Sequence, residues 1–335
     1  MHSILIIKLG AIGDVLRTTS ILRGLRKKYA ASITWLTKSS SYELLKNNEL
    51  IDNLVIFEKH DKFSEKFDLV INLDDDKAAC TIASETLSHK IIGAYLKDGK
   101  TAYTDDSAPW FDMGLISRFG RQRADKLKKE NKKTYQEILG EILDIDMSAP
   151  ILNLNEKSLE FPKDFANKNG IKEDDMVIGL NTSAGKRWKQ KRLSIDKTVE
   201  LINALNNNFK VKLLLFGGQE EVNRNKEILK KSGKTIINAG CKNSLLEFAS
   251  LINLCDLIIT SDSLAMNIAI ALKKKVVVFF GPTSAAEIEL YGKGKKIVPD
   301  MECICCYRKE CDKKPNCMDK IEVKAMIEAV KGCLS

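Results

Sequence analysis

The chain has 335 residues, of which 44% are hydrophobic and 30% charged, a composition typical of folded globular proteins and a length sufficient for two domains. Six prolines and 19 glycines exclude collagen-like and low-complexity classes. No apolar run approaches the roughly 18 residues of a membrane-spanning helix, and the first such run, Ile4–Ile7, is too short for a secretory signal. We therefore expect a soluble, cytoplasmic protein.

Short β-rich runs alternate with longer amphipathic segments, which predicts parallel sheets covered by helices. In the first half we expect strands at 3–8, 33–36, 54–57, 69–72 and 90–93, and helices at 15–29, 42–47, 78–87 and 132–143. In the second half we expect strands at 177–181, 211–216, 235–238, 257–260 and 276–280, and helices at 194–206, 220–231, 244–253 and 263–271. Residues 147–162 contain two prolines and little periodicity, which indicates a linker.

The α/β pattern thus predicts two Rossmann-like domains, over residues 1–155 and 156–320, with a last helix in 321–335 that packs back toward the first domain. Ligands of such sheets bind beyond the carboxyl ends of the strands. We therefore expect the functional residues in the loops that follow the strands, in a cleft between the domains.

The first predicted strand ends in the loop Lys8-Leu9-Gly10-Ala11-Ile12-Gly13-Asp14. Its two glycines allow a tight turn and a close approach to a ligand, but the spacing matches neither a dinucleotide-binding nor a Walker loop. Asp14 is either a helix cap or a carboxylate held at the end of a rigid strand, where it could act as a general base.

Similar loops follow the strands of the second half. Thr182-Ser183-Ala184-Gly185-Lys186 combines hydroxyls, a glycine and a lysine, which suits a diphosphate but also fits a solvated turn. Gly217-Gly218-Gln219-Glu220 offers an acid to a ribose hydroxyl or to a helix N-terminus. Two further turns follow, Asp262-Ser263-Leu264 and Gly281-Pro282-Thr283. Together these loops predict a nucleotide-type ligand.

These motifs resemble glycosyltransferase family 9, the ADP-heptose:lipopolysaccharide heptosyltransferases and their relatives, over almost the whole chain. The resemblance implies a GT-B fold, an inverting transfer of a sugar from a nucleotide diphosphate, with ADP-heptose as the implied donor, and no required cofactor. It implies that Asp14 is the catalytic base and that Lys186 holds the diphosphate. The other residues that it implies bind the donor are Gly13, Thr182, Ser183, Gly217, Glu220, Asp262, Ser263 and Leu264.

Two features depart from this resemblance. The family commonly has Asp-Thr-Gly-x-x-His where this chain has Asp262-Ser263-Leu264-Ala265-Met266-Asn267, so the sugar and the base of the donor stay open. The triplet Asp74-Asp75-Asp76 resembles the metal-binding motif of an unrelated glycosyltransferase fold, but we interpret it as a solvated loop or an acceptor contact.

The net charge of +9 favours anionic partners, and eight cations against two acids lie between Arg118 and Lys133. This run is either a solvated helix face or a binding patch. The resemblance implies an anionic, lipid-linked saccharide acceptor, so we expect Arg118, Arg121 and Arg123 to contact it, with peripheral contact at the inner face of the cytoplasmic membrane. Nucleic acid is not expected, because no nucleic-acid motif accompanies the run.

Five cysteines lie close together, at Cys303, Cys305, Cys306, Cys311 and Cys317. Thiolates suit zinc or iron, but the spacing matches neither a zinc ribbon nor a ferredoxin, and reduced structural thiols or a disulfide are the alternatives. Two other functions also stay open. One is a sugar-nucleotide epimerase of the same fold, and the other is a non-catalytic protein that binds nucleotides or polyanions.

Overall fold

The computed structural model describes residues 2–185 and 188–335, which form two compact units. The first unit comprises Met1–Asn153 together with Ala286–Glu289, and the second comprises Leu154–Ala285 and Leu290–Ser335. The predicted boundary lies at 155/156, and no sequence pattern indicates that the short segment 286–289 belongs to the first unit.

The first unit contains a six-stranded sheet in the order β3-β2-β1-β4-β5-β6. All neighbours are parallel except β5 and β6, which form an antiparallel pair at one edge. The strands are β1 (Ser3–Ile7), β2 (Ser32–Thr37), β3 (Asn53–Ile56), β4 (Phe67–Asn72), β5 (Ser88–Lys97) and β6 (Lys100–Tyr103). This order places a topological switch point between β1 and β4.

Both faces of this sheet are buried. Successive side chains of β1 point to opposite sides and therefore enter two different cores. Ile4 and Ile6 belong to a core formed with α2 and α7, whereas Leu5 and Ile7 pack with the alanines of α4. The helices of the unit are α1 (Ile12–Thr18), α2 (Leu22–Tyr29), α3 (Ser39–Leu45), α4 (Lys77–Glu85), α5 (Ala108–Phe111), α6 (Gly120–Glu130) and α7 (Tyr135–Leu143).

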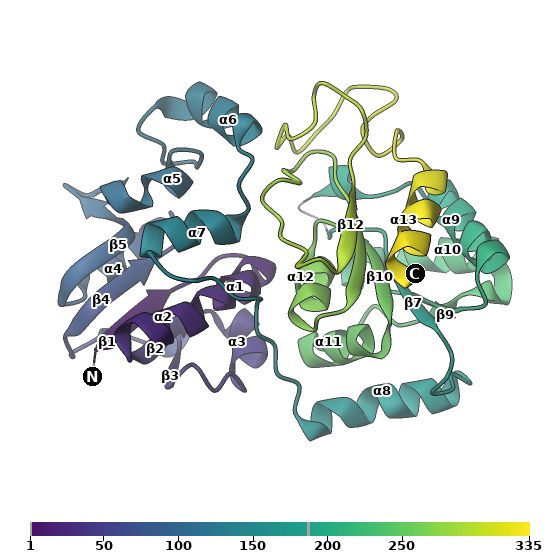
Figure 1. Ribbon diagram of the computed structural model, residues 1–335, viewed down its shortest axis with the longest axis horizontal. Helices are drawn as coiled ribbons and strands as arrows, with labels where there is room; N and C mark the ends of the chain where they lie inside the picture. The colour runs from purple at the N-terminus through teal and green to yellow at the C-terminus, as the bar shows by residue number, and fades with distance from the viewer. Residues whose placement is uncertain (1, 186–187) are drawn as a thin grey trace. The chain divides into compact units, whose positions relative to one another are not determined.

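The second unit repeats this architecture with a fully parallel sheet in the order β12-β11-β10-β7-β8-β9 (Figure 1). Its switch point lies between β7 and β10. The strands are β7 (Val177–Asn181), β8 (Lys212–Leu215), β9 (Ile237–Asn238), β10 (Leu257–Ser261), β11 (Lys275–Phe279) and β12 (Gly294–Ile297).

Helices cover both faces of the second sheet as well. The helices α9 (Ile195–Asn208), α10 (Val222–Ser232) and α13 (Val323–Leu334) share a core with one face. The helices α11 (Leu245–Leu254) and α12 (Leu264–Ala271) contact each other, and α8 (Glu156–Lys168) packs on α11. Short 3-10 turns, η4 (Lys189–Lys191) and η5 (Gln219–Glu221), lie in two of the loops after strands.

Two elements differ from the sequence prediction. Residues 156–168 form α8 rather than part of a linker, with Asn155 accepting a hydrogen bond from the Ser158 backbone at 2.9 Å and Pro162 inside the helix. The last helix, α13, was expected to pack toward the first domain. Its buried residues Met326 and Val330 instead lie in the core of the second unit, where the helix packs on α9, β11 and β12.

Within residues 2–185 and 188–335, the helices are too short or too polar to cross a lipid bilayer.

Candidate functional site

Each sheet presents two loops at its switch point, where α/β proteins bind ligands beyond the carboxyl ends of the strands. In the first unit these loops follow β1 and β4, and they contain Asp14 and the aspartate triplet. In the second unit they follow β7 and β10, and they contain Ser183 and the Asp262-Ser263 pair. Four of the predicted motifs therefore occupy the positions at which this architecture holds ligands.

Asp74 fixes the loop after β1. Its carboxylate accepts hydrogen bonds from Lys8 Nζ at 2.5 Å and from the backbone amides of Leu9 and Gly10, the latter at 3.1 Å. Burial disfavours the Lys8 ammonium, but the negative charges of Asp74 and Asp14, the Tyr135 side chain and the hydrogen bond to Asp74 together outweigh this effect and raise the Lys8 pKa. The interpretation of this triplet as a solvated loop is therefore wrong for Asp74, which is 8% exposed.

The other two aspartates of the triplet have different roles. Asp76 caps α4, because its carboxylate accepts a hydrogen bond from the Ala79 backbone at 3.2 Å. Asp75 is half-buried, and this burial, reinforced by the charge of Asp74, raises the pKa of its carboxyl group. Only Asp76 is exposed, as a solvated loop would require.

Asp14 lies in the first turn of α1 and does not cap it. The N-cap residue is Ala11, which provides no side-chain hydrogen bond. The Asp14 carboxylate is 44% exposed and lies 3.1 Å from the guanidinium of Arg17. The guanidinium carbon of Arg17 lies 4.1 Å from the centre of the Tyr135 ring. A carboxylate that is partly exposed and oriented by a cation on a rigid turn can accept a proton from a bound hydroxyl group.

The loop after β7 is held by the polar residues at the switch point of the second unit. The Asn181 amide nitrogen donates to the Ser183 carbonyl and to Ser263 Oγ, each at 3.2 Å. Thr182 is 1% exposed, and its hydroxyl accepts a hydrogen bond from Thr198 on α9 at 3.2 Å, so it faces the interior. Lys186, the predicted diphosphate contact, lies outside the residues that the structure describes.

Glu220 and Glu221 follow β8 and differ in their environments. Glu220, predicted to bind the ribose, is exposed on η5. Glu221 is 4% exposed, and its carboxylate accepts hydrogen bonds from the Gly218 backbone and from Ser183 Oγ, both at 2.9 Å. Glu221 therefore ties the loop after β8 to the loop after β7. Sequence analysis did not identify this role.

Lys191 orients the loop after β10, although its lysine-rich surroundings suggested a solvated side chain. It is 7% exposed, and its Nζ donates to the carboxylate of Asp262 at 2.6 Å and to the Asp262 carbonyl at 3.0 Å. Ser263 is the N-cap residue of α12, but its hydroxyl contacts Thr260 Oγ1 at 2.9 Å and makes no capping bond. Leu264 begins the helix. The first amides of α12 therefore have no side-chain cap, which leaves the N-terminus of this helix suited to an anion.

The sequence of this chain matches a protein-family model over most of its length. Residues 62–316 match the model described as glycosyltransferase family 9 (heptosyltransferase). The match covers more than half of the chain and includes most of the site residues of the second unit. The chain belongs to glycosyltransferase family 9.

Two curated relatives in this family have the same name. The chain is 30% identical over 216 residues to lipooligosaccharide heptosyltransferase 2 of Campylobacter jejuni serotype O:6, which covers 61% of this chain and 66% of the relative. It is 28% identical over 218 residues to the protein of the same name from serotype O:2, covering 62% of this chain and 66% of the relative. The alignments thus span just under two thirds of the relatives' length.

Solved structures in the family share the fold over almost the full chain. The family 9 glycosyltransferase of Veillonella parvula superposes with a TM-score of 0.76 at 21% identity, covering 99% of this chain and 97% of that one. The ADP-heptose LPS heptosyltransferase II of E. coli superposes with a TM-score of 0.64 at 17% identity, covering 99% and 98%. These likenesses confirm the predicted GT-B class with two parallel-sheet domains.

The basic run of this family 9 protein is partly neutralised by its own acids. Arg118 lies 3.0 Å from Asp105 and 3.1 Å from Asp112, which commits its guanidinium to contacts within the first unit. Arg121 and Arg123 are exposed on α6, and Arg121 lies 3.9 Å from Asp125. Of the three predicted acceptor contacts, Arg121 and Arg123 are the more accessible.

The cysteine-rich segment packs against the loop after β11. The backbone amide of Cys305 donates to the Gly281 carbonyl at 2.8 Å, and that of Tyr307 donates to the Pro282 carbonyl at 2.7 Å. Burial raises the pKa of the Cys317 thiol to about 11, with Cys306 and Cys311 acting in the same direction. Across the described residues there is no group of three or more potential metal ligands, so the zinc or iron site stays a prediction.

Proposed function

We propose that this protein is an inverting glycosyltransferase that moves a heptose from ADP-heptose to a hydroxyl group of a lipid-linked saccharide. The observation that carries the proposal is the position of Asp14, a partly exposed carboxylate in the first turn of α1, which follows β1 at the switch point of the first sheet. The family match and the names of the curated relatives support heptosyl transfer as the reaction.

The loops of the second unit are suited to a nucleotide diphosphate. We assign the diphosphate to Lys186 and to the first amides of α12 after Asp262, Ser263 and Leu264, because Ser183 is buried and donates its hydroxyl proton to Glu221. We assign the ribose to Glu220 next to Gly217, because an exposed carboxylate can accept hydrogen bonds from ribose hydroxyls. The positive potential from Lys186 and from the N-terminus of α12 would stabilise the charge that develops on the departing diphosphate.

In the proposed mechanism, Asp14 takes the proton of the acceptor hydroxyl. At the same time the oxygen of that hydroxyl forms a bond to the anomeric carbon of the donor sugar. The bond between that carbon and the diphosphate oxygen breaks on the opposite side, and its electron pair leaves with the nucleotide. A carboxylate is a weak base, so proton transfer must accompany bond formation rather than precede it. Arg17 orients the Asp14 carboxylate through its contact at 3.1 Å.

We assign the acceptor to the first unit. Its charge would be recognised by Arg121 and Arg123 on α6, and the same patch would bring the protein to an anionic membrane surface.

Asp14→Asn tests the role of the base. We expect transfer from ADP-heptose to a lipopolysaccharide core acceptor to fall by about 10²–10⁴-fold, the usual contribution of a general base, while the affinity for ADP stays unchanged. Asp61→Asn, which changes an exposed carboxylate of the same unit, is the matched control and should retain full activity.

Full activity of Asp14→Asn would contradict the proposed base. Conversion of the sugar nucleotide in the absence of acceptor would indicate an epimerase instead. Binding of ADP with no turnover in the wild type, over a panel of sugar nucleotides and acceptors, would favour a non-catalytic protein.

A further inference from the structure

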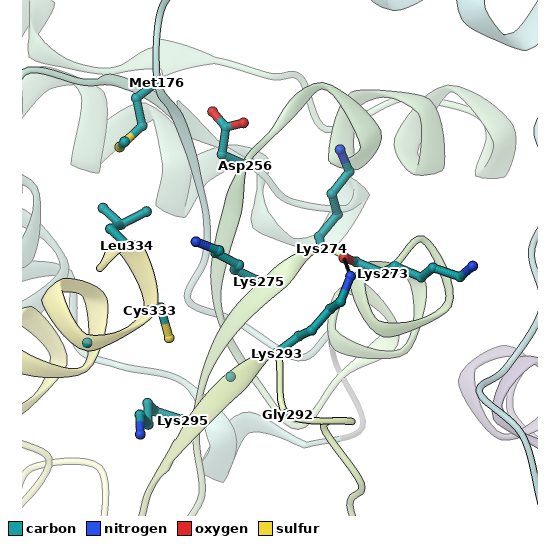
Figure 2. Close-up of a pocket in the computed structure, with 12 residues that line it drawn as sticks. Met176, Asp256, Lys273, Lys274, Lys275, Gly292, Lys293, Lys295, Cys333 and Leu334 are labelled. Carbon is teal, nitrogen blue, oxygen red and sulfur yellow. Dashed lines mark hydrogen bonds between the residues drawn. The ribbon is translucent and has the colours of Figure 1, made fainter.

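The second unit contains a pocket of about 510 Å³ at the edge of its sheet where the strands begin (Figure 2). Met176 precedes β7, Asp256 precedes β10, Lys275 begins β11 and Gly294 begins β12, and all four residues line the pocket. The proposed donor loops follow the other ends of these strands. At about 3.3 Å per residue, five-residue strands separate the two edges by about 16 Å. The pocket is therefore distinct from the donor site.

The alternation of side chains along the strands places two lysines on the same face of the sheet. Val277 of β11 and Ile297 of β12 pack into the core that includes α13. Lys275 and Lys295 each lie two residues before one of these positions, so they share the face that α13 covers. In the parallel pairing of β11 with β12, Val277 is opposite Lys295, so Lys275 and Lys295 lie diagonally across the two strands, on the same face.

The last turn of α13 forms the opposite wall with Gly332, Cys333 and Leu334. A Cβ atom at Gly332 would lie 3.8 Å from Cε of Lys295, so this lysine extends past the helix. Burial raises the pKa of the Cys333 thiol, and the ammonium groups of Lys295 and Lys275 oppose that rise because they lie nearby. Figure 2 shows the Lys275 amine directed toward the space between Met176 and Leu334.

The pocket carries an excess of positive charge. Five lysines line it, at positions 273, 274, 275, 293 and 295, and within the described residues none of them forms an ion pair with a carboxylate. The one acid in the lining, Asp256, accepts a hydrogen bond from the Val177 backbone at 2.8 Å. Even with about half a negative charge from each of the C-termini of α12 and α13, a balance of about +3 remains. Such an excess beside a half-buried lysine, Lys274, suits a multivalent anion.

We propose that this pocket binds a small phosphorylated molecule, with Lys275 and Lys295 holding its phosphate groups and Met176 and Leu334 contacting its less polar part. Lysine ammonium groups bind phosphate as mobile point charges, and the pocket volume lies within the range of small-molecule sites. The proposal does not depend on the reaction proposed above.

Titration calorimetry with inorganic tripolyphosphate at fixed ionic strength tests the proposal. We expect the full-length wild type to bind this probe and Lys275→Gln/Lys295→Gln to bind it at least about tenfold more weakly. Lys163→Gln/Lys168→Gln removes the same charge from exposed positions of α8 in the same unit and should leave the affinity unchanged. Phosphate binding at the donor loops is common to the wild type and both double variants, so only the difference between the two variants is assigned to the pocket.

A measurement on the wild type covers the case in which the pocket variant fails to fold. Acetylation of lysines followed by mass spectrometry should show that tripolyphosphate slows the modification of Lys275 and Lys295 but not of Lys163. Equal weakening in both double variants, absence of protection, or binding that occurs only with phosphatidylglycerol vesicles would each overturn the proposal.

Discussion

Adjacent residues of this protein occupy opposite environments at the proposed ribose site. Glu220 is exposed on η5, whereas Glu221 is buried and holds the loops after β8 and β7 together through Gly218 and Ser183. The difference arises because both residues lie in a 3-10 turn, where consecutive side chains point about 120° apart. Glu221 therefore has a structural role, and the ribose-binding role is proposed for Glu220.

Glu220→Gln is expected to weaken donor binding without weakening the fold. The loss of a charged hydrogen bond to a ribose hydroxyl corresponds to about 1.5–3 kcal/mol, which is roughly a tenfold or greater rise in the donor KM. The free energy of unfolding should stay unchanged, because the carboxylate is exposed. Donor titrations and urea unfolding measure the two quantities.

Glu221→Gln is the matched variant one position later. It replaces a buried carboxylate that accepts two hydrogen bonds and lies 3.4 Å from Arg192, so unfolding should become easier by about 1–3 kcal/mol. If Glu220→Gln destabilised the protein and Glu221→Gln altered only the KM, the two assignments would have to be exchanged.

Asp75 gives the first unit a pH-dependent contribution to stability. Burial raises the pKa of this carboxyl group in the folded protein, so between its ordinary pKa and the raised one the folded state binds more protons than the unfolded state. Stability from this group is therefore present at low pH and is lost as the pH rises through the raised pKa. Asp75→Asn should increase the free energy of unfolding at pH 7 and give no increase at pH 3, as measured by urea unfolding. An equal effect at both pH values would contradict this.

At the scale of elements, periodicity alone located most of the sheet. The strand at Val177–Asn181 was predicted with its observed bounds, because a fully buried parallel strand is a continuous apolar run between turns. The edge strands β6 and β12 were missed. Their sequences, Lys-Thr-Ala-Tyr and Gly-Lys-Lys-Ile, are short and polar because edges are only partly buried.

Glycines and hydroxyl residues predicted the loops that follow the strands, but no sequence pattern predicted the side chains that hold these loops in place. Lys191 and Asp74 act through partners 71 and 66 residues away in the chain, Asp262 and Lys8. Long-range pairs of this kind leave no local pattern, and a lysine in a lysine-rich stretch is usually solvated. The sequence could therefore identify the ligand-facing residues more readily than the residues that position them.

Gly281 lies where the loop after β11 contacts the cysteine-rich segment, and we expect a larger residue there to destabilise the protein. A Cβ atom at Gly281 would lie 2.5 Å from both the Cys317 sulfur and the terminal methyl of Met318. Gly281→Ala should therefore displace the segment and lower the free energy of unfolding by about 1–3 kcal/mol, the usual cost of overpacking. Thermal and urea unfolding measure the loss.

Gly332→Ala is the corresponding control in α13. The nearest atom to an added Cβ is Cε of Lys295, at 3.8 Å, and alanine favours a helix over glycine by up to about 1 kcal/mol. This variant should match or exceed the wild-type stability. A stable Gly281→Ala protein would show that the cysteine-rich segment adapts to the loop rather than packing rigidly on it.

At the scale of the whole molecule, the two units repeat one strand order with different chemistry at their switch points. The first carries a carboxylate, Asp14, oriented by a cation, and the second carries hydroxyls and a helix N-terminus suited to phosphate. This division predicts that variants of the first unit change transfer or acceptor binding, whereas variants of the second change donor binding.

The assignment of acceptor binding to the first unit can be tested through its exposed positive charges, because their effect depends on ionic strength. Arg121→Glu/Arg123→Glu reverses two exposed charges on α6 and should raise the KM for an anionic lipid-linked acceptor by about tenfold at low salt. The difference from the wild type should shrink as salt is added, because exposed charges are screened within about 8 Å at physiological ionic strength. Lys163→Glu/Lys168→Glu changes the net charge equally on α8 of the second unit and should leave the acceptor KM unchanged.

Equal effects of the two reversals would mean that overall charge, rather than α6, attracts the acceptor. No effect of either reversal would mean that the basic run is a solvated helix face.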